Sequence, residues 1–174
     1  PQFYWQQRNG DEELAALGAV ITFSSLALAT QFLREQNAAG DTRICGLNAF
    51  NPEQGSLFLP RLLWRRTAGT ATLRLQLWSD YSLQEDAHAA RDFLQQLQPA
   101  RPIRPLAVQV EHENHQPQRA EWLRLVRRAT ETIARGDFEK VVLARATDLQ
   151  FTQRINPVAL MAASRALNLH CYHF

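Results

Sequence analysis

The chain has 174 residues, of which 45% are hydrophobic and 21% are charged, and its formal net charge is +2. This composition is typical of a globular protein and excludes a disordered or fibrous chain. The basic residues form no dense run, and no apolar stretch reaches the roughly 18 residues that span a membrane, so neither nucleic acid nor a membrane is an expected partner.

Strand patterns dominate the first half of the chain. The signal Asn9-Gly10-Asp11 predicts a tight turn between the first two strands, because glycine adopts the positive φ that such turns need. Leu73, Leu75 and Leu77 alternate with Arg, Gln and Trp, which is typical of a half-buried strand. The predicted strands of this half cover residues 3–8, 14–23, 43–50, 56–60, 62–66 and 70–79.

Two helices are predicted between these strands and after them. Ser24 or Ser25 can cap the first helix, which runs to about residue 37 and has Gly40 as its stop signal. Ser82 and Glu85 have the spacing of a capping box, which predicts a second helix over residues 83–98.

The second half carries two more helices and two strands. Pro117 opens a helix with an apolar stripe, and Gly136 stands where a helix C-terminal glycine belongs. The pair Asn156-Pro157 starts the last helix, which ends near residue 167. Predicted strands cover residues 106–110 and 138–151.

These elements predict an α+β fold, in which helices pack on one face of a large, mostly antiparallel β-sheet. Three prolines within residues 99–105 mark a connection between residues 1–98 and 106–174. Because the composition is alike on both sides, we expect residues 1–174 to be part of one domain, with a sheet and helix region before the connection and the start of a core after it.

Both ends of the chain are strand-like, which leads us to expect a piece of a longer protein. The last five residues predict the start of a strand. Its open edge would favour pairing, either with a second copy of the chain in a homodimer or with the missing C-terminal half. Cys45 and Cys171 lie in apolar surroundings, so two buried thiols in a reducing compartment are favoured over a disulfide.

Several catalytic signatures are absent, namely the glycine-rich nucleotide loops, HExxH, CxxC and the GxSxG elbow. His112 and His115 lie in a polar stretch that we interpret as a solvated loop rather than a metal site. Strand alternation places His170 and His173 on opposite faces, so a shared ligand role is not expected.

Lys140 is the residue with the clearest chemical potential. On the predicted strand it shares a face with Phe138, Val142 and Ala144, close to the end of a helix. A lysine on an enclosed apolar face has a lowered pKa and can act as a general base near neutral pH. The alternative is a lysine at a strand end that extends into water or guards an edge.

The stretch Ile133–Arg145 resembles the shared motif of the chorismate-utilising enzymes, in which a helix ends in Gly-Asp and a strand of the type Lys/Gln-Val-Val-Leu-Ser/Ala-Arg follows. Other stretches resemble the isochorismate synthases of menaquinone synthesis, so that the resemblance covers the whole chain but only about the first half of such an enzyme. These stretches are Pro1–Gly10, Gly46–Phe50, Leu59–Leu62, Ala71–Leu75 and Met161–Arg165.

The resemblance implies a cytoplasmic isomerase, which converts chorismate to isochorismate by adding water at C2 with loss of the C4 hydroxyl. In this family a lysine at residue 140 belongs to the enzymes that use water, whereas those that use ammonia usually have glutamine. Lys140 would then be the general base, and residues 106–174 would begin the chorismate-binding core. In the family, glutamates bind the magnesium ion and a further glutamate supplies the acid, and all of them are expected beyond residue 174. The glutamates of this chain are therefore given no role, and this piece alone is expected to be inactive.

Two other functions stay open at this stage. A salicylate synthase, or an isochorismate synthase of a siderophore pathway, would carry the same lysine. A binding domain without catalytic activity would need no partner half at all. The motif gives Arg145 no catalytic role, and its side chain could simply pair with a carboxylate.

Overall fold

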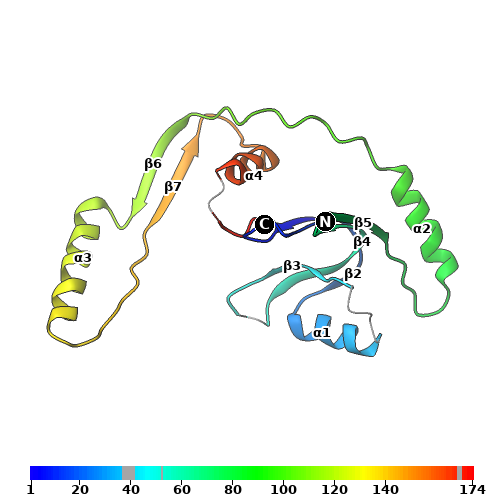
Figure 1. The fold of residues 1–174 in the computed structure, drawn as a ribbon, viewed down its shortest axis with the longest axis horizontal. Coiled ribbons are helices and arrows are strands. Elements are labelled where there is room, and N and C mark those ends of the chain that lie inside the picture. Colours follow the sequence, from blue (N-terminus) through cyan, green and yellow to red (C-terminus); the bar gives the residue numbers. More distant parts are fainter. Residues whose placement is uncertain (37–41, 52, 168–169) are drawn as a thin grey trace. The chain divides into compact units, whose positions relative to one another are not determined.

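The structure is a computed structural model that describes residues 1–36, 42–51, 53–167 and 170–174. It divides into two compact units, the first made of Pro1–Pro102 with Leu167–Phe174 and the second of Ile103–Ala166 (Figure 1). Among the described residues, no helix combines the length and the apolar character needed to cross a bilayer.

The first unit is built on a five-stranded antiparallel sheet. Its long strand β4 (Gly55–Thr67) pairs with β2 (Glu12–Phe23) along one edge, and with β3 (Cys45–Asn48) and β5 (Thr70–Leu75) along the other. Strand β1 (Gln2–Gln6) pairs with β2 through the predicted turn, in which Gly10 has φ +75°. The antiparallel pairing confirms the predicted fold class.

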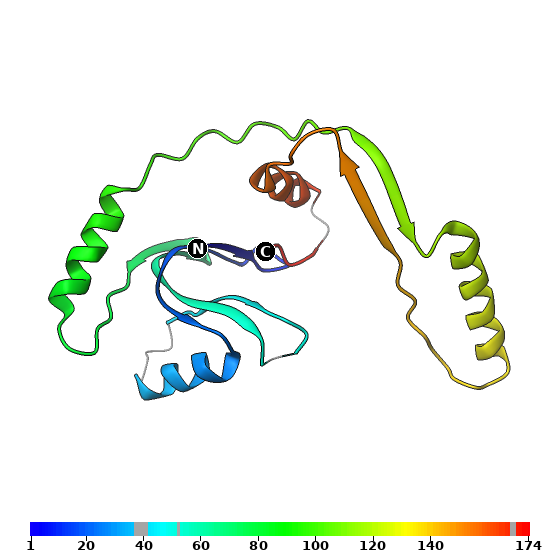
Figure 2. The same cartoon turned by 180° about the vertical axis from the view of Figure 1, so that it is seen from behind.

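Helices α1 (Leu26–Glu35) and α2 (Leu83–Gln95) belong to this unit (Figures 1 and 2), and each contacts the sheet through side chains. Ala29 of α1 is buried in a cluster with Leu57 and Leu59 of β4. Arg61 of β4 binds α2 through an ion pair, and it alternates with Leu57 and Leu59 along the strand. Each helix thus contacts β4, α1 through this cluster and α2 through the ion pair.

The caps of these helices agree with the sequence, except in one detail. Ser25 Oγ accepts from Leu28 N at 3.3 Å, and Ser82 Oγ accepts from Gln84 N at 3.3 Å. The predicted capping box with Glu85 is wrong, because the N–H of Ser82 donates to Ser79 Oγ at 3.2 Å instead. Helix α2 also ends at Gln95, earlier than predicted, and the predicted stop signal Gly40 lies outside the described residues.

Strand β4 corrects the prediction of two separate strands, 56–60 and 62–66. It runs through Pro60, whose missing N–H would normally interrupt a central strand. Pro60 pairs with Ala19, directly beside a register shift in β2 between Ala19 and Ile21. On the other edge, Gln76 Nε2 donates to the carbonyl oxygen of Pro60 at 2.6 Å. The irregularity in β2 therefore accommodates the proline, and its carbonyl still has a partner.

The predicted half-burial of the leucines on β5 is also wrong. Leu73 is 67% exposed and Leu75 42% exposed, and Leu77 lies beyond the end of the strand. Their alternation is correct, but the face that Leu73 and Leu75 share is exposed.

The two cysteines differ from the prediction of two buried thiols. Cys45 is buried in the core cluster and Cys171 is exposed, and the two form no disulfide. Burial raises the pKa of Cys45 to about 11, although the charge of Arg43 acts in the opposite direction. Cys171 is exposed because the predicted strand at residues 170–174 is reduced to one bridge, between Gln6 and His173.

The second unit contains a two-stranded antiparallel sheet of β6 (Val110–Gln116) and β7 (Ala146–Phe151), with helices α3 (Arg119–Ala134) and α4 (Pro157–Ala166). Asn156 Oδ1 caps α4 by accepting from Val158 N at 2.9 Å, as predicted. The predicted strand 106–110 is wrong, because β7 ends opposite Val110 and offers no further ladder. Residues 106–109 are held only by isolated bonds, such as that from Gln153 Nε2 to Ala107 O at 2.6 Å.

Candidate functional site

The segment that carries Lys140 is not the strand that its sequence predicts. Of residues 138–151, only 146–151 form a strand. The pairing of β6 with β7 ends at Gln116 opposite Ala146, and β6 is followed by Pro117, which has no N–H and leads into α3. Within the described part of the chain, residues 137–145 therefore have no neighbouring strand, and they run extended from α3 to β7 (Figure 1).

The start of this segment is fixed by the end of α3. Gly136 has φ +82°, and its N–H donates to Ile133 O at 2.9 Å while Asp137 N donates to Thr132 O at 3.3 Å. These two bonds form a Schellman motif, which confirms the predicted C-terminal glycine. Arg135 adds an ion pair with Asp137 Oδ2 at 3.2 Å. The chain direction at residue 137 is thus well defined.

The end of the segment is held by one side-chain bond. Arg145 Nε donates to the carbonyl oxygen of Pro117 at 3.2 Å, across 28 residues of sequence. The partner is a backbone carbonyl between β6 and α3. The sequence had left a carboxylate partner for Arg145 as a possibility.

Lys140 lies between these two attachments and is exposed. Among the residues that the structure describes, none forms a hydrogen bond or an ion pair with its side chain. The apolar face predicted beside it is present but uncovered, since Val142 is 81% and Phe138 38% exposed. The described residues therefore present Lys140 on an open surface, and they do not by themselves enclose it.

The stretch of His112 and His115 corrects the prediction of a solvated loop, because both residues lie on strand β6. His115 stands opposite Thr147 of β7, and its Nδ1 lies 2.9 Å from Thr147 Oγ1. Its Nε2 lies 3.6 Å from Glu113 Oε2. The backbone of β7 makes this polar stretch a strand, which local sequence could not reveal. In the described ranges, no three His, Cys, Asp or Glu residues gather where they could hold a metal ion.

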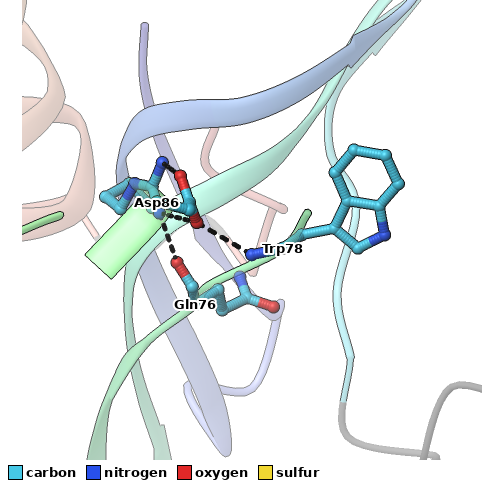
Figure 3. A network of polar contacts seen from close by, with 4 residues as sticks. Gln76, Trp78 and Asp86 are labelled. Atoms are coloured by element: carbon cyan, nitrogen blue, oxygen red, sulfur yellow. Dashed lines mark hydrogen bonds and ion pairs between the residues drawn. The ribbon is translucent and has the colours of Figure 1, made fainter. Parts of the chain in front are cut away.

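A polar cluster that the sequence did not reveal lies in the first unit (Figure 3). Arg61 donates to both carboxylate oxygens of Asp86, at 2.6 and 2.5 Å, and also to the carbonyl of Gln76 at 2.8 Å. Trp78 N donates to Asp86 Oδ2 at 2.8 Å. The hydrogen bonds from Arg61 hold the pKa of Asp86 below its ordinary value, against the effect of burial. Since both charges are paired, the cluster fastens α2 to the sheet and is structural.

Residues 137–145 line neither of two open hollows in the structure. One, of about 930 Å³, lies along α1 and is open to solvent. Another, of about 360 Å³, lies in the second unit and is lined by Ile103, Arg104, Pro105, Leu106, Ala159, Ala162 and Ala163. Neither is lined by residues 137–145, so neither serves as the site of the predicted base.

Comparison with known proteins agrees with the resemblance seen in the motif. The chain is 55% identical to the isochorismate synthase MenF of Escherichia coli and 30% identical to that of Haemophilus influenzae, over 174 residues in each case. Each match covers the whole of this chain, but only 40% of the E. coli protein and 39% of the H. influenzae protein. The solved structure of the E. coli protein, described as the menaquinone-specific isochorismate synthase, superposes with a TM-score of 0.85 over 99% of this chain and 40% of that chain.

The family model described as chorismate binding enzyme matches residues 48–174, which include the whole Lys140 segment and both strands of the second unit. That range is well over half of the chain. The chain therefore belongs to the chorismate binding enzyme family.

Proposed function

We propose that the complete protein containing this chain is an isochorismate synthase, which converts chorismate to isochorismate for menaquinone synthesis. The observation that carries the proposal is 55% identity along the entire chain to a relative with that name. Because the chain spans about 40% of that relative, the activity is assigned to the complete protein and not to these residues alone. The proposed location is the cytoplasm.

We assign the general base to Lys140. It is the one lysine of the chain, the other 18 of the 19 basic residues being arginine. Arginine stays protonated in proteins, whereas a lysine can lose its proton and accept another. Lys140 is thus the basic side chain of this sequence that suits proton abstraction from water, and it occupies the motif position that favours water over ammonia.

The proposed step leaves the composition of the substrate unchanged, because one water molecule is consumed and one is released. Lys140 takes one proton from a water molecule, the hydroxyl adds at C2 of chorismate, both ring double bonds shift by one position, and the C4 hydroxyl takes a proton from an acid and leaves as water. We assign that acid to a glutamate outside these 174 residues. A lysine becomes a base near neutral pH when it is shielded from water, because desolvation lowers its pKa. We expect the rest of the protein to cover the exposed surface around Val142 and so to enclose Lys140.

Magnesium is a further part of the proposal. Chorismate is a dianion, and a divalent cation would offset its charge and hold its carboxylates. The described residues do not fit a magnesium site, because no group of three possible ligands occurs among them. We therefore assign the ion to residues outside this chain.

Product analysis of the complete protein tests the function. Incubation with chorismate and Mg²⁺, followed by chromatography, should give isochorismate, and the isolated 174-residue chain should give none. Salicylate with pyruvate as the main products would replace the proposal with a salicylate synthase. Binding of chorismate without turnover would indicate a non-catalytic domain.

A further inference from the structure

The last residues of the chain lie at the outer edge of strand β1, the edge that faces away from β2. The N–H of Gln6 donates to His173 O at 2.9 Å, and the N–H of His173 donates to Gln6 O at 3.2 Å. The two residues form an antiparallel bridge, and both belong to the first unit. Directly opposite residues that exchange both bonds are the repeating element of an antiparallel ladder. The bridge therefore sets the direction and the register of a strand that continues from it.

The backbone groups of β1 alternate between its two edges. Gln6 bonds at the outer edge through both its N–H and its C=O. The next residue, Gln7, donates to Glu12 O of β2 at 2.8 Å, on the inner side. In an antiparallel sheet, residues alternate in this way between the neighbour on one side and the neighbour on the other. The N–H and C=O groups of Gln2 and Tyr4 therefore point to the outer edge, as those of Gln6 do.

The side chains near the bridge fit the same register. Trp5 packs against the core cluster of the first unit, and Tyr172 stacks on Trp5 with the ring centroids 5.9 Å apart. The guanidinium carbon of Arg8 lies 5.2 Å from the centroid of the Tyr172 ring. A strand that continues from the bridge would place Phe174 directly opposite Trp5, on the same face as Tyr172. The aromatic side chains of such a strand would thus extend the core side of the sheet.

We propose that the residues directly after Phe174 in the complete protein form a strand that pairs with the outer edge of β1 and extends the sheet of the first unit. The bridge directs the chain from Gln6 toward Gln2. The first residue after Phe174 then lies opposite Tyr4, and the third lies opposite Gln2. A relative of which this chain covers 40% has the further residues that such a strand needs.

The occupant of this edge is a segment of the same chain and not a second copy. The bridge and the aromatic stack already hold the chain at one end of the edge. The next three residues reach Tyr4 and Gln2 without closing a further loop, so little additional entropy is lost. A strand from a second copy would have to displace His173 to use the whole edge, and association would cost that copy its free translation and rotation.

Hydrogen exchange of the complete protein, resolved to single amides, tests the pairing without any substitution. We expect the amides of Gln2 and Tyr4, which point to the outer edge, to exchange at least about 100-fold more slowly than in an unfolded chain. The amides of Phe3 and Trp5 are the matched control, because they point toward β2 and are protected by its pairing with β1. Slow exchange at Phe3 and Trp5 with unprotected exchange at Gln2 and Tyr4 would overturn the proposal.

A disulfide in the complete protein identifies the strand. The register places the second residue after Phe174 opposite Phe3 in a non-hydrogen-bonded pair, whose Cα atoms lie about 4.5 Å apart, within disulfide range. Phe3→Cys is therefore combined with a cysteine at that residue or, as the control, at the first residue after Phe174, which lies on the other face. Both variants carry Cys171→Ser, because Cys171 is exposed.

We expect a bond within one chain in the first variant only, located by peptide mass spectrometry and running as a monomer on a non-reducing gel. A disulfide-linked dimer would replace the proposal with pairing to a second copy. Equal crosslinking of the two variants, or none in either, would overturn the register.

Discussion

The sheet of the first unit and the Lys140 segment of the second use charge in opposite ways. In the first unit, Arg61 of the sheet is paired with Asp86 of α2, and these two side chains are only 9% and 15% exposed. In the segment, Lys140 is exposed and has no partner among the described residues. Paired buried charges fix a structure, whereas a cation left without a partner stays available for chemistry. The comparison favours a structural role for the Arg61 pair, and it leaves Lys140 available for the proposed reaction.

The largest stability effect should come from breaking the Arg61 pair. Asp86→Ala leaves Arg61, whose side chain is 9% exposed, with an uncompensated charge, which should lower the free energy of unfolding by about 3–5 kcal/mol. Urea unfolding of the complete protein measures the change. Asp80→Ala, at an exposed aspartate nearby, is the matched control and should stay within about 0.5 kcal/mol of the wild type. Equal effects of the two substitutions would show that the Arg61 pair does not stabilise the first unit.

Alanine substitutions at Gly18 and at Gly136 should give the next largest difference in stability. A Cβ on Gly18 would lie 2.8 Å from the ring of Phe93 on α2, at a backbone φ of +69°. A Cβ on Gly136 would meet nothing within 4 Å, at φ +82°. Gly136→Ala should therefore cost only the left-handed strain, about 1–2 kcal/mol, and Gly18→Ala about 1–3 kcal/mol more for overpacking. Thermal unfolding that ranks the two variants in the reverse order would contradict the packing of α2 on β2.

Acid should weaken the first unit through Asp86. Its pKa is lowered in the folded state, mainly by hydrogen bonds from Arg61, so the unfolded state takes up a proton first as the pH falls. The stabilising contribution is complete above the unfolded pKa of about 3.9 and is lost as the pH falls through the folded pKa. The stability gap between the wild type and Asp86→Asn should therefore narrow below about pH 4. If the difference in the free energy of unfolding between the two proteins stayed constant from pH 7 to pH 2.5, the charge of Asp86 would not contribute to stability.

Helix ends were predictable because their signals are local. Ser25, Asn156 and Gly136 act within four residues of themselves, and each cap forms where the sequence places it. Strand limits depend on partners far away in the chain. The continuation of β4 through Pro60 depends on an irregularity in β2, and the late start of β7 at Ala146 depends on Pro117, which follows the end of β6.

The candidate site divides in the same way. Lys140 could be identified from its motif, because residue type and spacing carry the chemistry. The bond from Arg145 to Pro117 could not, since a side chain that binds a carbonyl 28 residues away leaves no local pattern. The pair of Arg61 and Asp86 was missed for the same reason, as 25 residues separate them.

The most direct test of the account is the rate of isochorismate formation by the complete protein with Lys140 replaced. Lys140→Ala removes the amine, and Lys140→Arg keeps the positive charge but cannot give up its proton. The account predicts that both variants fold, bind chorismate and lose at least about 100-fold in kcat. A Lys140→Arg variant with near-normal kcat would show that residue 140 supplies charge and not a base, and a Lys140→Ala variant with near-normal kcat would remove it from the reaction.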